Sequence, residues 1–199
     1  MKIFRMGLLC TALLTASFAV AQQVDAAFGL GTVISTSGSN VSPSSNYFPQ
    51  DVGGGVFPGL SADFMLRHRF GVGGEIFWRA GQNSYFGYQP FRPIFWNFNG
   101  VWAPQIRTRL GAELVAGIGE ESIRYYQPYA ICSSFTGCTD YTSQGHLMGA
   151  FGGGLRVYVT EHVFVRPEAR LYLIHDNFQF SSGHATRVGV SVGYSFGGP

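Results

Sequence analysis

Charged residues are scarce in this chain, and one kind of positive charge is almost absent. Only 12% of the residues are charged, which is about half the share in an average soluble protein. The single lysine is Lys2, so the rest of the chain carries its positive charge on arginines alone. Nucleic-acid binding requires a clustered basic face, which this composition does not supply. We therefore expect no nucleic-acid partner.

Long hydrophobic runs are also absent beyond the first 21 residues, so no later segment approaches the ~20 apolar residues of a transmembrane helix. The one apolar run, residues 6–20, follows Lys2 and Arg5 and leads to small residues at positions 19 and 21. This is the pattern of a secretory signal peptide, which we expect to be cleaved after Ala21. An uncleaved membrane helix is the alternative, although the run is short for one. Residues 22–199 would then form one domain, with eleven arginines and eleven acidic residues.

Only two cysteines follow the signal peptide, Cys132 and Cys138, and both lie in a polar segment rich in Ser, Thr and Gly. In an exported protein this spacing predicts a disulfide that closes a small surface loop. Metal binding would need further ligands, and the closest histidine, His146, stands alone. We expect no metal site and no cofactor.

A period-two alternation of apolar and polar residues is the clearest pattern present. In residues 163–174 it places Arg166, Glu168 and Arg170 on one face, while the opposite face is apolar. A strand of this kind suits a small membrane β-barrel, because the outer wall of such a barrel meets lipid and its interior is polar. A soluble lipocalin-like barrel is the alternative. It would place apolar side chains inside and charged ones outside, the reverse of this pattern.

The alternation recurs in eight stretches, namely residues 26–34, 56–66, 70–79, 92–102, 109–119, 146–159, 163–174 and 187–196. The connections between them alternate between long and short, with four long loops and three tight turns. The sequence therefore predicts an all-β chain, an eight-stranded antiparallel up-and-down transmembrane β-barrel, located in the outer membrane with both termini on the turn side. Aromatic residues near the strand ends are expected to form interfacial girdles. They are Trp78, Trp102, Tyr158, Tyr172 and Tyr194.

Ionisable residues occur on the faces that would point into the barrel, with Arg109 at the rim. The predicted charge network in the lumen comprises Asp63, Glu75, Glu113, Arg156, Arg166, Glu168, Arg170 and Arg187. Acids and arginines confined in a narrow interior are expected to pair, which would fill the lumen with a polar plug. A small gated pore, in which the arginines exchange partners, is the alternative. The glycine runs at 71–74 and 152–154 precede no helix, so we interpret them as inward positions in a narrow barrel and not as a nucleotide site.

The alternating segments, the loop lengths and the last strand, RVGVSVGYSF, resemble the small outer-membrane β-barrel superfamily of OmpA-type and OmpX-type proteins. The segments FRPIFWNFNGVWAP and FVRPEARLYLIHDN are similar to those of its barrel domains of uncharacterised function. The resemblance implies insertion by the barrel-assembly machinery, for which a terminal strand that ends in an aromatic residue, here Phe196, is the recognition signal. It also implies contact with outer-membrane lipids.

Function is less clearly indicated than fold. We expect a monomeric, non-enzymatic protein with a structural or surface-interaction role. A surface ligand would bind the long loops, in particular residues 129–144 and the segment around Tyr85, Phe86, Tyr88 and Phe91. Membrane anchoring is the alternative role for the aromatic residues of these loops. A lipid A-modifying enzyme is the alternative. Its candidate residues are His184 with Ser181 or Ser182, and His175 with Asp176.

Overall fold

The computed structural model of the chain describes residues 23–35, 51–67, 69–85, 88–133, 137–175 and 183–197, and its strands form one antiparallel sheet. The strands are β1 (Gln23–Ile34), β2 (Phe57–Arg67), β3 (Phe70–Trp78), β4 (Asn83–Tyr85), β5 (Gln89–Trp102), β6 (Gln105–Arg107), β7 (Leu110–Ser133), β8 (Gly137–Tyr158), β9 (Val163–Ile174) and β10 (His184–Phe196). The predicted signal peptide lies outside the described residues. Among those described, no helix has the length and hydrophobicity needed to cross a membrane.

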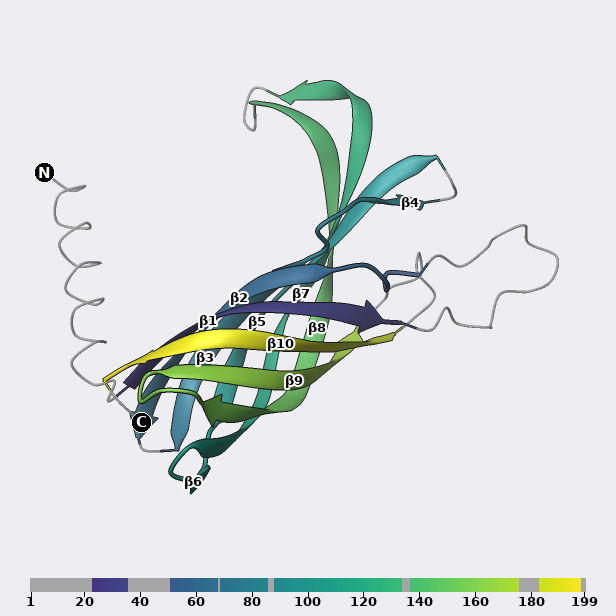
Figure 1. The fold of residues 1–199 in the computed structure, drawn as a ribbon. Helices are drawn as coiled ribbons and strands as arrows, with labels where there is room; N and C mark the ends of the chain where they lie inside the picture. Colours follow the sequence, from purple (N-terminus) through teal and green to yellow (C-terminus); the bar gives the residue numbers. More distant parts are fainter. Residues whose placement is uncertain are drawn as a thin grey trace, which may run out of the picture.

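Eight of the strands close into a ring in which each long strand pairs with its neighbours in the chain (Figure 1). The order is β1-β2-β3-β5-β7-β8-β9-β10, and β1 closes the ring by pairing antiparallel with β10, with Val24 opposite Phe196 and Ile34 opposite Thr186. A closed ring leaves no unpaired sheet edge, as a sheet surrounded by lipid requires. The predicted fold class, an eight-stranded antiparallel up-and-down barrel, is confirmed.

Two of the predicted strands are much longer than the sequence pattern indicated. β7 was expected to end at Gly119 or to continue through Arg124, and β8 was expected to begin at His146. The structure extends β7 to Ser133 and starts β8 at Gly137. The extensions pair with each other from Glu120 opposite Leu147 as far as Tyr126 opposite Tyr141, and again near the tip. Close to the ring one face of the β7 extension is still buried, at Glu121, Ile123 and Tyr125. Farther out, residues 128–130 and most of 137–145 are exposed on both faces, so the sequence pattern carries no signal there. The short strands β4 and β6 were also not predicted.

Burial alternates along the strands of the ring as period-two alternation requires. In β9 every second residue from Phe164 to Ile174 is buried, and the residues between them are partly or fully exposed. Within the ring, the exposed set is apolar on all eight strands, with Phe98 and Ile118 each about two-thirds exposed or more. These side chains form the apolar outer wall of the barrel, which suits contact with hydrocarbon.

Candidate functional site

Large side chains fill the interior of the barrel because glycines on neighbouring strands leave room for them. Gly152 lies directly opposite Arg170, and a Cβ atom added there would be 2.5 Å from Cδ of Arg170. Gly154 similarly leaves space for Arg166. The interpretation of both glycine runs as wholly inward was wrong, because alternation turns Gly74 and Gly153 to the outer wall, where their nearest side-chain neighbours are Phe98 and Leu114.

The half of the interior nearer the turns is organised around Arg156 of β8. Its guanidinium donates from Nε to Oε2 of Glu113 over 2.7 Å and from Nη2 to Oδ2 of Asp63 over 3.0 Å, and Nη1 contacts Asp25. These three carboxylates come from β7, β2 and β1, so one arginine ties together strands from opposite sides of the ring. Arg156 and the three acids are all buried.

Arg166 of β9 links this half of the interior to the other. Its Nη1 lies 2.7 Å from Oε2 of Glu113, and its Nε lies 2.8 Å from Oε2 of Glu168. The same guanidinium donates to the hydroxyls of Ser61 and Ser191 at 3.0 and 3.1 Å. Arg166 therefore uses most of its donors, as a buried guanidinium must if its desolvation is to be offset.

Arg170 and Arg187 complete the network towards the loop end. Arg170 pairs through Nη2 with Glu113 at 3.0 Å and with Glu168 at 3.3 Å, and through Nε with Glu75 at 3.4 Å. Arg187 pairs with Oε1 of Glu168 at 2.9 Å. Its guanidinium carbon also lies 3.4 Å from the centre of the Phe77 ring, a cation–π contact.

All eight residues predicted for the lumen thus lie in the interior, and ion pairs join them into one network. The structure adds one member that sequence reasoning missed, Asp25, because the first strand was expected to begin at Ala26. Asp25 lies two residues before Ala27 and four before Gly29, so period-two alternation places it on the same inward face and could have predicted its position. The network contains five carboxylates and four guanidiniums among the described residues. Arg109 lies outside it, exposed at the turn before β7.

Apolar layers close the interior on both sides of the charge network. On the turn side the layer consists of Ala27, Tyr158, Phe164, Met65, Val101 and Val115. On the loop side it consists of Val33, Phe57, Phe95, Met148, Ala150, Tyr172, Ile174 and Ala185. The rings of Phe95 and Tyr172 stack across the barrel with centroids 5.2 Å apart. Tyr158 and Tyr172 belong to these layers, so their predicted place in the interfacial girdles was wrong.

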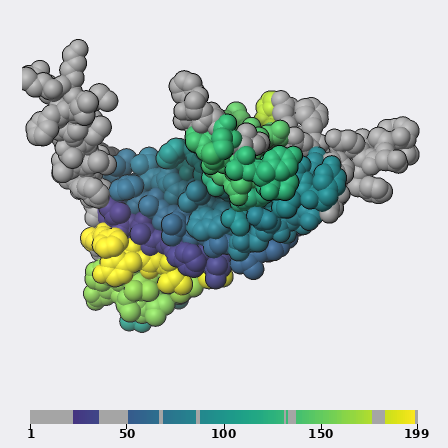
Figure 2. Space-filling view, turned by 90° about the horizontal axis from the view of Figure 1, so that it is seen from above, coloured from purple at the N-terminus to yellow at the C-terminus, as the bar shows by residue number. Residues whose placement is uncertain are grey.

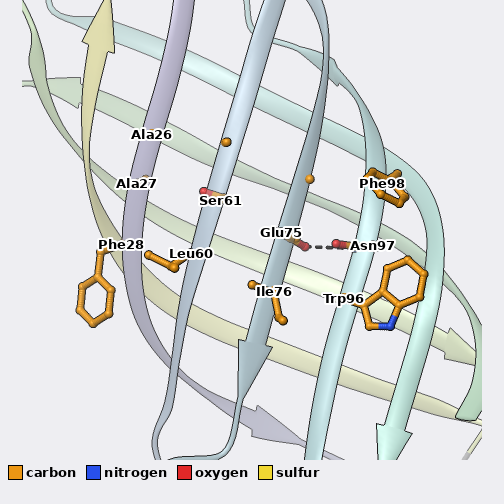
Figure 3. Close-up of a pocket in the computed structure, with 12 residues that line it drawn as sticks. Ala26, Ala27, Phe28, Leu60, Ser61, Glu75, Ile76, Trp96, Asn97 and Phe98 are labelled. Atoms are coloured by element: carbon orange, nitrogen blue, oxygen red, sulfur yellow. Dashed lines mark hydrogen bonds between the residues drawn. The ribbon is translucent and has the colours of Figure 1, made fainter. Parts of the chain in front are cut away.

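The outer wall contains an apolar hollow of about 640 Å³ over β1, β2, β3 and β5. A row of small residues, Ala26, Ala62 and Gly74, lies in direct cross-strand register and forms its floor. Larger side chains such as Phe28 and Trp96 project from the wall beside it, whereas Glu75 and Asn97, joined by a 3.1 Å hydrogen bond, belong to the inner face (Figure 3). The hollow faces outward, where hydrocarbon chains would fill it.

Beyond the ring, β7 and β8 continue as a two-stranded extension, residues 126–133 and 137–147, which we call the ribbon (Figure 1). Figure 2 looks onto it, in green above the earlier strands in blue and teal. The predicted disulfide between Cys132 and Cys138 is confirmed and joins the two strands near the tip. Four residues of β7, 127–130, lie opposite Asp140 alone, so the ribbon contains a wide bulge.

A cluster of aromatic and aliphatic residues supports the base of the ribbon. Phe91, Ile123 and Tyr125 are buried there together with Val52, and the Tyr85 ring packs edge-on against Tyr125 with centroids 5.6 Å apart. Burial raises the pKa of the Tyr125 hydroxyl, so this group stays protonated and neutral. The cluster fixes the ribbon and the β4–β5 hairpin to the loop end of the barrel.

The candidate residues for an enzyme are only partly described. His175 donates its backbone N–H to the carbonyl of Leu147, and the His184 carbonyl accepts from the Ser35 hydroxyl. Asp176, Ser181 and Ser182 lie outside the described residues, so no nucleophile–base geometry is defined. Within the described part of the chain, no group of three or more His, Cys, Asp or Glu is placed to hold a metal ion.

Comparison with solved structures finds proteins that share this architecture at low sequence identity. The attachment invasion locus protein Ail of Yersinia pestis, solved with the heparin analogue sucrose octasulfate, has a TM-score of 0.56 and 13% identity, covering 87% of this chain and 98% of Ail. Neisserial surface protein A has a TM-score of 0.60 and 11% identity, covering 87% of this chain and 96% of that protein. This chain has the fold of the small outer-membrane β-barrels.

A third barrel of this type gives the same result. The N-terminal β-barrel domain of Pseudomonas aeruginosa OprF has a TM-score of 0.55 and 15% identity, covering 88% of this chain and 98% of the domain. No protein-family model and no curated protein matches the sequence. The resemblance identified from the sequence is therefore supported by architecture, and the apolar outer wall agrees with the predicted outer-membrane location.

Proposed function

We propose that this protein is a non-enzymatic, non-conducting outer-membrane barrel that holds its ribbon and long loops at the cell surface for interaction with a partner. The observation that carries the proposal is the contrast between the two parts of the molecule. The interior is filled by paired charges between apolar layers, whereas the ribbon extends past the ring and presents exposed side chains.

A closed interior is favoured because opening a pore through the barrel would break several buried ion pairs. Each of the four arginines pairs with at least two carboxylates from other positions in the ring. Separating one buried guanidinium from its partners would leave an uncompensated charge, at a cost of about 3–5 kcal/mol. On the turn side, the hollow that reaches Arg156 measures only about 40 Å³. The gated-pore alternative would need several such separations together.

Surface interaction is supported by what the ribbon presents. Tyr129 is 71% exposed, and Tyr88 at the neighbouring hairpin is 78% exposed. Exposed tyrosines beside small polar residues are common in binding surfaces. The structurally similar Yersinia pestis protein is named for attachment and invasion.

Assembly and lipid contact follow the same proposal. Phe196 ends β10 with its ring on the outer face, where it contacts the Tyr194 ring with centroids 4.7 Å apart. We propose that this aromatic residue at the end of the last strand is the signal bound by the barrel-assembly machinery, as the family resemblance implies. We propose that the assembled barrel is a monomer surrounded by outer-membrane lipid.

Bilayer conductance tests the closed interior. Purified protein whose folding is verified by heat-modifiable gel mobility should show near-zero steady conductance after insertion into planar bilayers. Large, stable steps of the porin type would contradict the closed interior, because they require a continuous aqueous path.

Whole-cell binding tests the surface role. Residues 127–140 can be replaced by an Asn-Gly turn, because Tyr126 and Tyr141 lie directly opposite each other and a two-residue turn can join them. Cells that display the shortened protein should lose binding to host cells or extracellular matrix, while the barrel keeps its heat-modifiable mobility. Unchanged binding would contradict the role of the ribbon.

A further inference from the structure

A second pocket, of about 710 Å³, lies at the loop end, between the tip of the β4–β5 hairpin and the base of the ribbon. Its position follows from the register. β5 pairs with β7 only as far as Phe91 opposite Tyr125, and the ribbon then continues without β5. The bulge at residues 127–130 begins two residues after Tyr125, the last residue of β7 that pairs with β5. The pocket therefore forms where the sheet divides, and its volume is within the range of about 300–1,000 Å³ typical of small-ligand sites.

Flat, apolar groups form part of the pocket wall. Tyr88 and Tyr126 contribute aromatic rings, and Pro90 and Pro128 contribute pyrrolidine rings. The Tyr126 ring is held in place, because the guanidinium of Arg92 lies over it at 5.7 Å and the ring of Tyr141 packs at 6.2 Å. A fixed ring next to an exposed one gives a ligand two stacking surfaces at low cost in side-chain entropy.

Neutral hydrogen-bonding groups and one acid form the rest of the wall. Gln82, Gln89 and Gln127 supply side-chain amides, and each amide has two N–H donors and one carbonyl acceptor. Asp140 supplies a carboxylate. Neither lysine nor arginine is among the described lining residues, and the guanidinium of Arg92 borders the wall only through its contact with the Tyr126 ring. The wall can therefore bind several hydroxyl groups, and the carboxylate disfavours an anionic ligand.

We propose that this pocket binds a neutral saccharide. The rings of Tyr88 and Tyr126 would pack against the C–H faces of the sugar, and the glutamine amides with Asp140 would bind its hydroxyls. A sugar is the ligand class that combines apolar faces with a dense rim of uncharged hydroxyls, which matches this wall. The inference rests on the proposed surface-interaction function and names the chemistry of its ligand.

A glycan array can test the proposal with the whole protein. Fluorescently labelled protein in phospholipid nanodiscs, purified in a detergent without a sugar headgroup, is applied to neutral oligosaccharides such as lactose, maltotriose and N-acetyllactosamine, and to heparin fragments. We expect binding to at least one neutral glycan. Saturation-transfer NMR on that glycan should then show magnetisation passing from tyrosine rings to its C–H protons.

A matched pair of variants locates the binding. Tyr88→Ala removes a lining ring and should weaken glycan binding about tenfold, whereas Tyr129→Ala removes a similarly exposed ring that does not line the pocket and should leave binding unchanged. Asp140→Asn should weaken binding of a neutral glycan, because it removes a charged acceptor. Equal effects of the two tyrosine variants would overturn the proposal.

The remaining outcomes separate this inference from the proposed function. Binding of heparin fragments alone, strengthened by Asp140→Asn, would show an anion site and overturn the saccharide proposal. If replacement of residues 127–140 abolishes cell binding but no neutral glycan binds, the surface role stands and the saccharide site does not. Competition by purified lipopolysaccharide would support the site and assign its sugar to the membrane's own lipid. Absence of competition with glycan binding intact would support a sugar on another cell.

Discussion

Glu113 is one of the two carboxylates of the network that pair with three arginines, the other being Glu168, and replacing Glu113 by glutamine should strongly destabilise the barrel. Its two oxygens lie within 3.0 Å of nitrogens from three arginines, Arg156, Arg166 and Arg170. Glutamine has nearly the same volume, so the change is electrostatic. It removes the charge and turns an amide N–H₂ towards guanidinium donors. Loss of one partner from a buried ion pair costs about 3–5 kcal/mol, so we expect Glu113→Gln to lower the free energy of unfolding by about 3 kcal/mol or more.

Asp25→Asn is the matched control, because it makes the same chemical change in the same network. Asp25 contacts Arg156 and accepts a 2.7 Å hydrogen bond from the Gln23 amide, and Arg156 keeps Glu113 and Asp63 without it. Five carboxylates face four guanidiniums, so neutralising Asp25 removes the surplus negative charge. The loss of one contact and the relief of repulsion oppose each other, and we expect a change within about 1 kcal/mol.

Urea unfolding at equilibrium, with the folded fraction read from heat-modifiable gel mobility and tryptophan fluorescence, measures both variants. Glu113→Asp keeps the charge but withdraws it by one methylene, so its stability should fall between those of wild type and Glu113→Gln. A Glu113→Gln barrel within 1 kcal/mol of wild type would refute the reasoning. So would an Asp25→Asn barrel as unstable as Glu113→Gln.

Three further predictions concern the wall and the ribbon. Gly152→Ala should destabilise the barrel by about 1–3 kcal/mol in the same urea assay, since its Cβ would clash with Arg170, whereas Gly74→Ala, with 3.6 Å of clearance, should change little; equal effects would show that interior space is not limiting. Val190→Arg, on the outer face near the middle of β10, should lower the free energy of unfolding by about 2–4 kcal/mol, whereas Val159→Arg, at the turn end, should lower it by at most about 1 kcal/mol. The reverse order would contradict the placement of the middle of β10 at the centre of the hydrocarbon layer. Reduction of the disulfide should leave the unfolding midpoint unchanged but speed limited proteolysis at the ribbon tip, and a lowered midpoint would show that the ribbon stabilises the ring.

The sequence determined most of the fold. Period-two alternation is a local property, because successive side chains of a strand point to opposite faces whatever its partners are. The eight strands of the ring and their faces could therefore be predicted, and β9 has the bounds that its pattern indicated, Val163–Ile174. The alternation also placed the eight ionisable residues on inward faces. The disulfide could be predicted because Cys132 and Cys138 are the only cysteines after the expected signal peptide, and their spacing in an exported protein is typical of a bond that closes a small surface loop.

Only the tertiary structure decided which charges meet. Partners such as Glu113 and Arg170 come from strands that are not neighbours in the ring, and their contact depends on closure and on cross-strand stagger, which no local pattern encodes. Asp25 joined the network because pairing with β10 extended β1 past its predicted start. The ribbon and the pocket at its base were equally hidden, because their strands lie against neither lipid nor core. A strand whose two faces both meet solvent does not need apolar residues on one face, so its sequence shows no period-two alternation.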